Sequence, residues 1–189
     1  MRSAIFASLS LLMAGGAFAQ ANEEAARDQL FRGDAQAVSV ADVDFLGAAE
    51  IAALKQYAAQ FDYYAALAVS PGDPAETGSA VALANFHSPA AAQRAALGAC
   101  NARRTTGEPC VIVSVTTPKG YRARDLTLSA EATAAFEEEY RGASSPKAMA
   151  ISEATGHFGI GAGAERALSV CNTAAAAEGP RDCRVVIAD

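Results

Sequence analysis

The sequence predicts an α+β fold built from two pseudo-symmetric strand–strand–helix–strand repeats, with an N-terminal helical region in front of them. The first observation is a pattern that occurs twice, Ala-Leu-x-x-Cys-Asn followed by Cys-x-[Val/Ile]-[Val/Ile], beginning at Ala96 and again at Ala167. The second is a short apolar phrase upstream of each copy, at 66–70 and 148–152, which is typical of a buried strand. All four cysteines keep their register, which indicates a duplicated unit held by disulfides.

The N-terminal part, residues 20–62, is expected to form a helical cap without a counterpart in the second repeat. An acidic, alanine-rich stretch predicts a first helix over 22–31. A second helix is predicted over 42–61, because apolar residues recur there at helical spacing. These residues are Phe45, Ala49, Ala52 and Ala53.

Repeat 1 is expected to span residues 63–120 and repeat 2 residues 147–189, with a connecting segment over 121–146. In each repeat a helix ends near the first cysteine, and a β-branched strand begins at the second. Repeat 1 is longer by about eleven residues, which we place around 71–79 because proline and glycine interrupt the pattern there.

Serine, proline and glycine residues predict where the helices begin and end. Ser88 followed by Pro89 predicts the start of the helix in repeat 1. A connecting helix is predicted over 129–141, with Gly142 as its stop. The glycine run over 159–163 predicts a flexible turn into the helix of repeat 2, since it lacks the G-x-G-x-x-G spacing of a phosphate-binding loop.

The first nineteen residues have the pattern of a secretory signal peptide. Arg2 supplies a positive end, an apolar stretch follows, and Ala17-Phe18-Ala19 is typical of a cleavage site before Gln20. The apolar stretch is too short to cross a bilayer core of roughly 30 Å. We therefore expect a periplasmic or secreted protein that does not span the membrane.

The charge of the chain limits its partners. Its formal net charge is −6, and it has no basic block, since Arg103-Arg104 and Arg122 with Arg124 are only isolated pairs. Proteins that bind nucleic acids or anionic lipids usually carry blocks of basic residues, so neither a nucleic acid nor an anionic lipid is expected as a partner. An unknown protein or cell-envelope component is expected instead.

Four cysteines allow three disulfide connectivities. If each repeat descends from a unit that once folded alone, Cys100 pairs with Cys110 and Cys171 with Cys183. A zinc site would need short C-x(2–4)-C pairs, which are missing, and export favours disulfides over free thiolates. We therefore predict two local disulfides and no metal site.

Two histidines and two serines are the candidates for catalysis. His87 and His157 are expected just before the helix of each repeat, where a polar residue at a helix entry explains them. Ser70 and Ser152 are expected at equivalent strand ends, and no G-x-S-x-G nucleophile elbow is present. No catalytic residue is therefore assigned.

The phrases A-x-A-[Val/Ile]-S, A-L-x-x-C-N and C-x-[Val/Ile]-[Val/Ile] resemble those of small exported bacterial proteins of unknown function. The resemblance covers about residues 64–115 and 147–189. It implies the strand–helix–strand unit and its disulfide, and it implies no catalytic residue.

Relatives with this layout sometimes carry the label 5-aminolevulinic acid synthase. That enzyme needs a Schiff-base lysine for pyridoxal phosphate and a large two-domain scaffold. The three lysines, Lys55, Lys119 and Lys147, lie in no recognisable cofactor context, so we expect no cofactor. The expected function is non-catalytic binding, and the alternative is an enzyme, either that synthase or a small hydrolase that uses Ser70 or Ser152 with a histidine.

Overall fold

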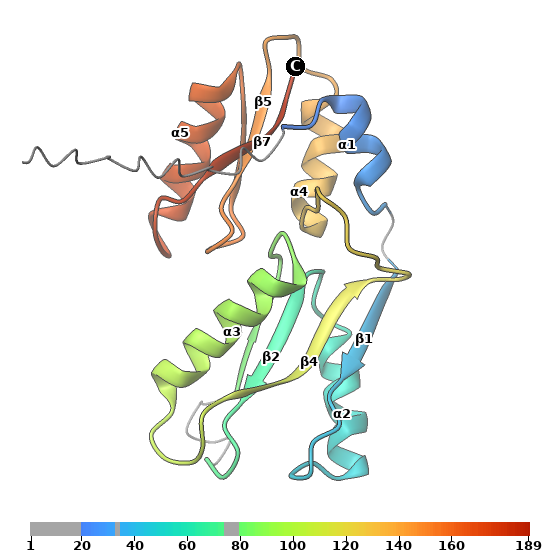
Figure 1. The fold of residues 1–189 in the computed structure, drawn as a ribbon, viewed down its shortest axis with the longest axis vertical. Helices are drawn as coiled ribbons and strands as arrows, with labels where there is room; N and C mark the ends of the chain where they lie inside the picture. The colour runs from blue at the N-terminus through green and yellow to red at the C-terminus, as the bar shows by residue number, and fades with distance from the viewer. Residues whose placement is uncertain (1–19, 33–34, 74–79) are drawn as a thin grey trace, which may run out of the picture.

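The computed structural model describes residues 20–32, 35–73 and 80–189. The expected signal peptide, residues 1–19, lies outside the described residues. Figure 1 shows two sheets, one above the other, with helices on the faces of each. The fold is α+β with one local disulfide beside each sheet, as the sequence predicts.

The lower sheet in Figure 1 has four antiparallel strands in the order β1-β4-β2-β3. The strands are β1 (Gln36–Val40), β4 (Val111–Pro118), β2 (Ala65–Val69) and β3 (Val81–Leu83). Helix α3 (Pro89–Arg103) covers one face, and α2 (Ala48–Ala58) lies against the other. This sheet with α2 and α3 is called the first module.

The upper sheet has three antiparallel strands in the order β6-β5-β7. The strands are β6 (Phe158–Gly161), β5 (Ala148–Ile151) and β7 (Arg184–Ala188). In both sheets the first strand of the repeat is central, the second strand lies on one side of it and the last strand on the other. The register shift also falls at the matching place, after Leu67 in β2 and after Met149 in β5.

Helices cover both faces of the upper sheet, which together with them is called the second module. Helix α5 (Ala164–Ala175) packs on Ala148 and Ala150. Met149 and Ile151 point to the other face, because side chains alternate along a strand. On that face lie α1 (Glu23–Gln29) and α4 (Ala130–Ala135), which continues as a π-helical turn, η2 (Phe136–Tyr140).

Polar side chains cap three of these helices, as their sequences allow. The Ser88 hydroxyl accepts a hydrogen bond from the Ala91 N–H, and Pro89 is the first residue of α3. Ser129 caps α4 in the same way, through the N–H of Ala132, and the Asn22 side chain caps α1. The predicted helix starts at Ser88 and Ser129 are therefore confirmed, because a cap depends only on neighbouring residues.

The N-terminal region contains an element that the sequence did not predict. Residues 36–40 form β1, which pairs with β4 in the first module. Helix α1, in contrast, packs on the second module through Ala26 and Leu30. The N-terminal region is therefore not one helical cap: its first helix belongs to one module, and its strand and second helix to the other.

We expected the extra residues of repeat 1 around 71–79, but the structure shows that most of them lie elsewhere. Leu83 in β3 and Gly161 in β6 are structurally equivalent, because each pairs with the same position of its central strand. From Ser70 to Leu83 there are 13 positions, whereas from Ser152 to Gly161 there are 9. From Leu83 to Cys100 there are 17 positions, whereas from Gly161 to Cys171 there are 10. Most of the additional length therefore follows β3, where α3 begins one turn earlier than α5 relative to its cysteine.

The glycine run of repeat 2 is mostly a strand, not the predicted flexible turn. Gly159 and Gly161 lie in β6, and only Gly163 acts as the N-cap of α5. A Cβ on Gly159 would lie 2.5 Å from the Cys171 nitrogen and 2.6 Å from the Ala167 oxygen. The glycines therefore allow the strand to approach the backbone of α5, which periodicity alone does not reveal.

Candidate functional site

The two disulfides tie the helix of each repeat to its last strand. Cys100 in α3 is bonded to Cys110, just before β4, and Cys171 in α5 is bonded to Cys183, just before β7. The Cα–Cα distance is 6.1 Å in both. The predicted pairing is confirmed.

An asparagine after each helix cysteine adds a second link to the same strand. The backbone N–H of Cys110 donates to Asn101 Oδ1 at 3.1 Å, and that of Cys183 donates to Asn172 Oδ1 at 3.3 Å. The Cys-Asn pair therefore holds its partner cysteine both covalently and by a hydrogen bond. Sequence reasoning missed this role, although the repeated Cys-Asn dipeptide was the available signal.

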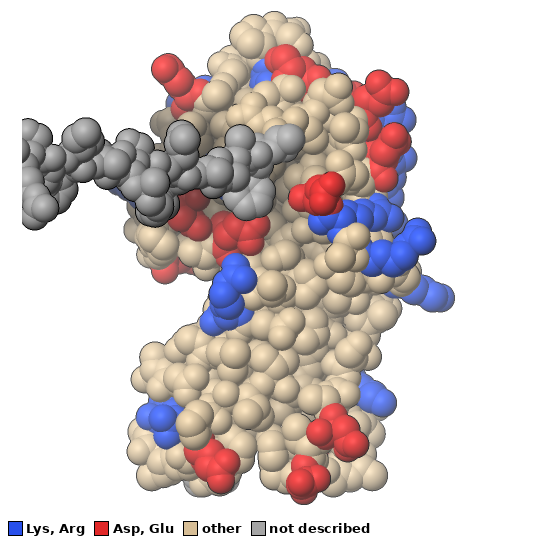
Figure 2. All heavy atoms as spheres, in the orientation of Figure 1, with Lys and Arg blue, Asp and Glu red and all other residues tan. Residues whose placement is uncertain are grey.

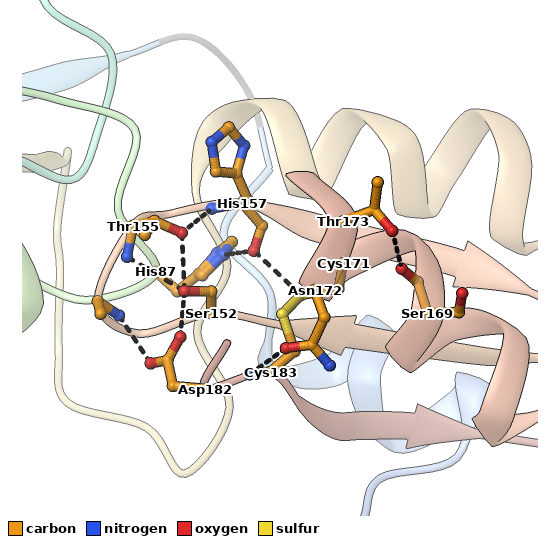
Figure 3. Close-up of a disulfide and its surroundings, with 11 residues drawn as sticks. His87, Ser152, Thr155, His157, Ser169, Cys171, Asn172, Thr173, Asp182 and Cys183 are labelled. Atoms are coloured by element: carbon orange, nitrogen blue, oxygen red, sulfur yellow. Dashed lines mark hydrogen bonds between the residues drawn. A yellow bond between two sulfur atoms is a disulfide. The ribbon is translucent and has the colours of Figure 1, made fainter. Parts of the chain in front are cut away.

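The strand-end serines are buried, and both hydroxyls donate hydrogen bonds within the protein. The Ser70 hydroxyl donates to the Glu108 carbonyl at 2.6 Å. The Ser152 hydroxyl donates to Asp182 and accepts from both the N–H and the hydroxyl of Thr155 (Figure 3). A hydroxyl has one donor and two acceptor positions, so Ser152 has none left for a histidine base. Both serines anchor the loops beside their strands.

His87 is fully buried where the two modules meet. Its Nδ1 accepts from the Ser129 N–H at 3.2 Å, so the ring proton is on Nε2, which donates to the His157 carbonyl at 3.1 Å (Figure 3). Burial lowers the pKa of His87 to about 4, against a smaller opposing effect of the bond to the His157 carbonyl. His87 is therefore a neutral bridge between the modules.

His157 is not the structural counterpart of His87, contrary to the expectation. His87 follows β3 and lies just before α3, whereas His157 precedes β6, well before α5. Its ring is about one-third exposed, and its Nε2 lies 3.6 Å from Glu178 Oε1. The two histidines meet through a ring and a backbone carbonyl, so they do not form a pair of catalytic rings.

The backbones of the two modules are also in close contact beside the histidines. Gly156, at φ +79°, lies so close to the first module that a Cβ would be 2.6 Å from the Asn85 carbonyl oxygen. The Asn85 side chain in turn bonds Glu131 at the start of α4. This region, where the loop after β3 meets the loop before β6, is called the waist.

One of the three lysines, Lys147, is buried within a charged cluster. Lys147 Nζ lies 2.8 Å from Glu23 Oε2, donates to the Tyr140 carbonyl, and sits 4.8 Å from the Tyr140 ring centre. The Asp189 carboxylate accepts from the Glu23 N–H and from the Tyr140 hydroxyl. The cluster attaches α1 to the second module, so Lys147 has a structural role.

The surface of α2 exposes apolar side chains. Ala58 is the single buried residue of the helix, and the Thr116 hydroxyl ties its carbonyl to β4 at 3.1 Å. The side chains of Phe45 and Tyr57 are 40% and 47% exposed. Ala48, Ala49, Ala52 and Ala53 are exposed as well. This set, with Phe45 and Tyr57, is called the α2 face.

Charged side chains border the α2 face: the exposed Asp44 precedes Phe45, and the exposed Glu50 and Lys55 lie on α2 itself. In Figure 2 the lower half of the molecule, which contains α2, presents mostly uncharged atoms, whereas charged groups gather on the upper half. The sequence predicted a helix over 42–61 with this apolar stripe; the observed helix is shorter, Ala48–Ala58, so Phe45 lies before its start. The structure shows that this stripe is exposed, which helical spacing cannot predict, because the same spacing occurs on stripes that face the core.

Neither a metal cluster nor a membrane-spanning helix is found in the described part of the chain. Among residues 20–32, 35–73 and 80–189, no group of three or more His, Cys, Asp or Glu side chains is placed to hold a metal ion. None of the described helices has the length and apolar character needed to cross a bilayer.

Comparisons with known proteins give no match. No protein-family model matches the chain, and none of the curated proteins or solved structures is similar to it. Support for a function therefore comes from the geometry of the molecule.

Proposed function

We propose that this is an exported, non-catalytic protein that binds a protein partner through the α2 face. The observation that carries the proposal is the exposure of Phe45 and Tyr57 beside a strip of alanines on a helix with one buried residue. Exposed contiguous apolar surface rimmed by polar residues marks interaction sites in soluble proteins.

The chemistry of the α2 face favours a helix or another apolar element of a partner protein. Alanines allow a second backbone to approach closely, and the two aromatic rings flank that strip as contact residues. Aromatic residues, tyrosine above all, are enriched at the centres of protein interfaces, and charged residues are depleted there. The α2 face itself consists of aromatic and alanine side chains, with charged residues at its border.

The hydrogen bonds made by the candidate serines and by His87 support a non-catalytic role. The hydroxyls of Ser70 and Ser152 and both ring nitrogens of His87 are used in hydrogen bonds that hold loops and modules. A nucleophile and its base must instead be within reach of each other and of a substrate.

Export and duplication belong to the same proposal. The signal pattern over 1–19 and the two disulfides support an oxidising compartment. The shared strand order, the matching register shift and the two equivalent Cys-Asn corners support a duplicated unit. An intact mass of the exported product that starts at Gln20 tests export, and a product that retains Met1 contradicts it.

Binding is tested by photo-crosslinking in an envelope extract, with the oxidised protein and two charge variants. Ala52→Glu places a carboxylate on the α2 face and should remove the crosslinked adduct. Ala164→Glu places the same charge on the exposed first turn of α5 and should leave the adduct unchanged. An adduct that both variants retain, or that both lose, would contradict the assignment of α2.

A further inference from the structure

A separate pocket of about 260 Å³ lies between the strands of the first module and the helix α4 of the second. Its walls come from the segment after α1, the start of β1, the residues just before β2 and the α4–η2 helix. The polar residues that line it are Arg32, Gln36, Asp62, Tyr63, Thr133 and Glu137. It shares no residue with the α2 face, so binding in this pocket is independent of the proposed function.

Three oxygen atoms of the pocket residues are buried without a hydrogen-bond partner. They are Thr133 Oγ1, Gln36 Oε1 and Glu137 Oε1. Thr133 is 6% exposed. Buried polar atoms in folded proteins are nearly always bonded, because an unbonded one has lost its water without replacement. Three such atoms beside one pocket therefore point to a ligand that donates hydrogen bonds.

The charge of the pocket favours a cation. Glu137 and Asp62 are carboxylates, and Arg32 is the only cation among the described residues that line the pocket. Arg32 Nε lies 3.4 Å from Glu137 Oε1 without forming a hydrogen bond, and its side chain is 52% exposed. Arg141 already pairs with the other carboxylate oxygen of Glu137, Oε2, whereas Oε1 has only the exposed Arg32 guanidinium beside it. A buried cationic donor would give Oε1 the hydrogen bond that it lacks.

A primary ammonium group fits these requirements. It carries one positive charge and three N–H donors, which match three unpartnered oxygens. Ala130, Ala134 and the buried Tyr63 supply an apolar wall for a short alkyl stem. Glu137 lies in the π-helical turn, a local form that is frequent at functional sites.

We propose that this pocket binds the primary ammonium group of a small alkylamine. The Glu137 carboxylate, the Gln36 carbonyl and the Thr133 hydroxyl accept its three hydrogen bonds, and Arg32 moves aside into solvent. The quaternary analogue carries the same charge but no N–H donor, so it is the matched probe for this recognition.

The test is calorimetric titration of the full oxidised chain at pH 7 with butylamine, butyltrimethylammonium and butyrate. Butylamine should bind, and the other two should give no measurable heat of binding. Equal binding of the quaternary ion would show that charge alone is recognised and would overturn the proposal. Absence of binding by all three probes would overturn it as well.

Two variants locate the binding in this pocket. Thr133→Val keeps the shape and removes the hydroxyl, so butylamine binding should weaken about tenfold. Thr173→Val removes a hydroxyl from the exposed surface of α5, where it bonds the Ser169 carbonyl, and should change nothing. Gln36→Glu adds an anionic acceptor and should tighten binding roughly fivefold, which a merely destabilised variant would not do. Unchanged affinity in both pocket variants would exclude this pocket as the site.

Discussion

At the scale of single residues, the side chains that were candidates for chemistry hold the fold together. Ser152 and Asp182 fix the loop after β5, and Asn101 and Asn172 fix the cysteine before the last strand of each module. His87 joins the two modules at the waist. Each of these groups is bonded to a backbone atom or a buried neighbour, so replacing one leaves an unpaired polar atom.

Replacing Asn172 by alanine should lower the free energy of unfolding by about 1–2 kcal/mol, because the N–H of Cys183 loses its acceptor. Asn172→Asp keeps an oxygen at the same place and should lose less. Urea denaturation of the oxidised proteins measures both changes. An aspartate variant as unstable as the alanine variant would argue against the hydrogen bond as the cause.

His87 should make the protein sensitive to mild acid. Burial lowers its pKa to about 4, whereas in the unfolded chain the pKa is close to 6.5. Between these values the unfolded state binds a proton that the folded state does not. The free energy of unfolding therefore falls as the pH drops from 6.5 to 4, and His87 causes no loss above pH 6.5. The loss from this residue is about 3 kcal/mol.

The acid effect of His87 is isolated by comparing the wild-type protein with His87→Gln. Glutamine has no titration in this range, so the difference in unfolding free energy between the two proteins should shrink from pH 7 to pH 4. Guanidinium denaturation at a series of pH values measures it. A difference that stays constant with pH would contradict the assigned pKa.

At the scale of elements, β6 and α5 approach each other closely. Gly159 and Gly161 have no side chain, and the strand uses that space to lie against the helix backbone. Small residues on the facing strand serve the same purpose, since Ala148 and Ala150 point to α5. The alanine- and glycine-rich composition of this repeat therefore reflects thin layers more than a large apolar core.

Gly159→Ala should destabilise the protein by roughly 2–3 kcal/mol, because its Cβ would meet backbone atoms that have no freedom to move. Gly98→Ala is the matched control. Gly98 lies on the exposed side of α3 with no atom within 4 Å of an added Cβ, so helix propensity should stabilise this variant by up to about 1 kcal/mol. Thermal unfolding of the two variants should therefore shift in opposite directions.

At the scale of the whole molecule, the chain crosses between the modules near its N-terminus and again before α4. Helix α1 belongs to the core of the second module, and β1 pairs in the first. Helix α4 precedes β5 and covers the same face as α1. The N-terminal segment therefore links the modules as the waist contacts do: α1 adds to the core of the second module, and β1 extends the sheet of the first.

Each disulfide should act within its own module. Replacing Cys100 and Cys110 together by alanine should lower stability by about 3 kcal/mol, because the unfolded chain regains the freedom of that loop. Cys171 and Cys183 should remain bonded. Chemical denaturation gives the first result and non-reducing peptide mapping the second. Free thiols at Cys171 and Cys183 in this variant would contradict local pairing.

The sequence by itself determined the features that depend on neighbouring residues. The cysteine repeat predicted both disulfides, the Ser88-Pro89 pair predicted the start of α3, and the apolar phrases predicted β2 and β5. These are local signals, because a cap, a strand phrase or a short disulfide loop is complete within a few residues.

Only the tertiary structure decided the features in which distant segments meet. Residues 36–40 become a strand because β4 offers its edge, and the glycine run becomes β6 because α5 lies against it. The burial of His87 and the exposure of the α2 face depend on which surfaces the second module and α1 cover. Periodicity gives the type of an element, whereas contacts between distant parts of the chain decide which of its faces is buried.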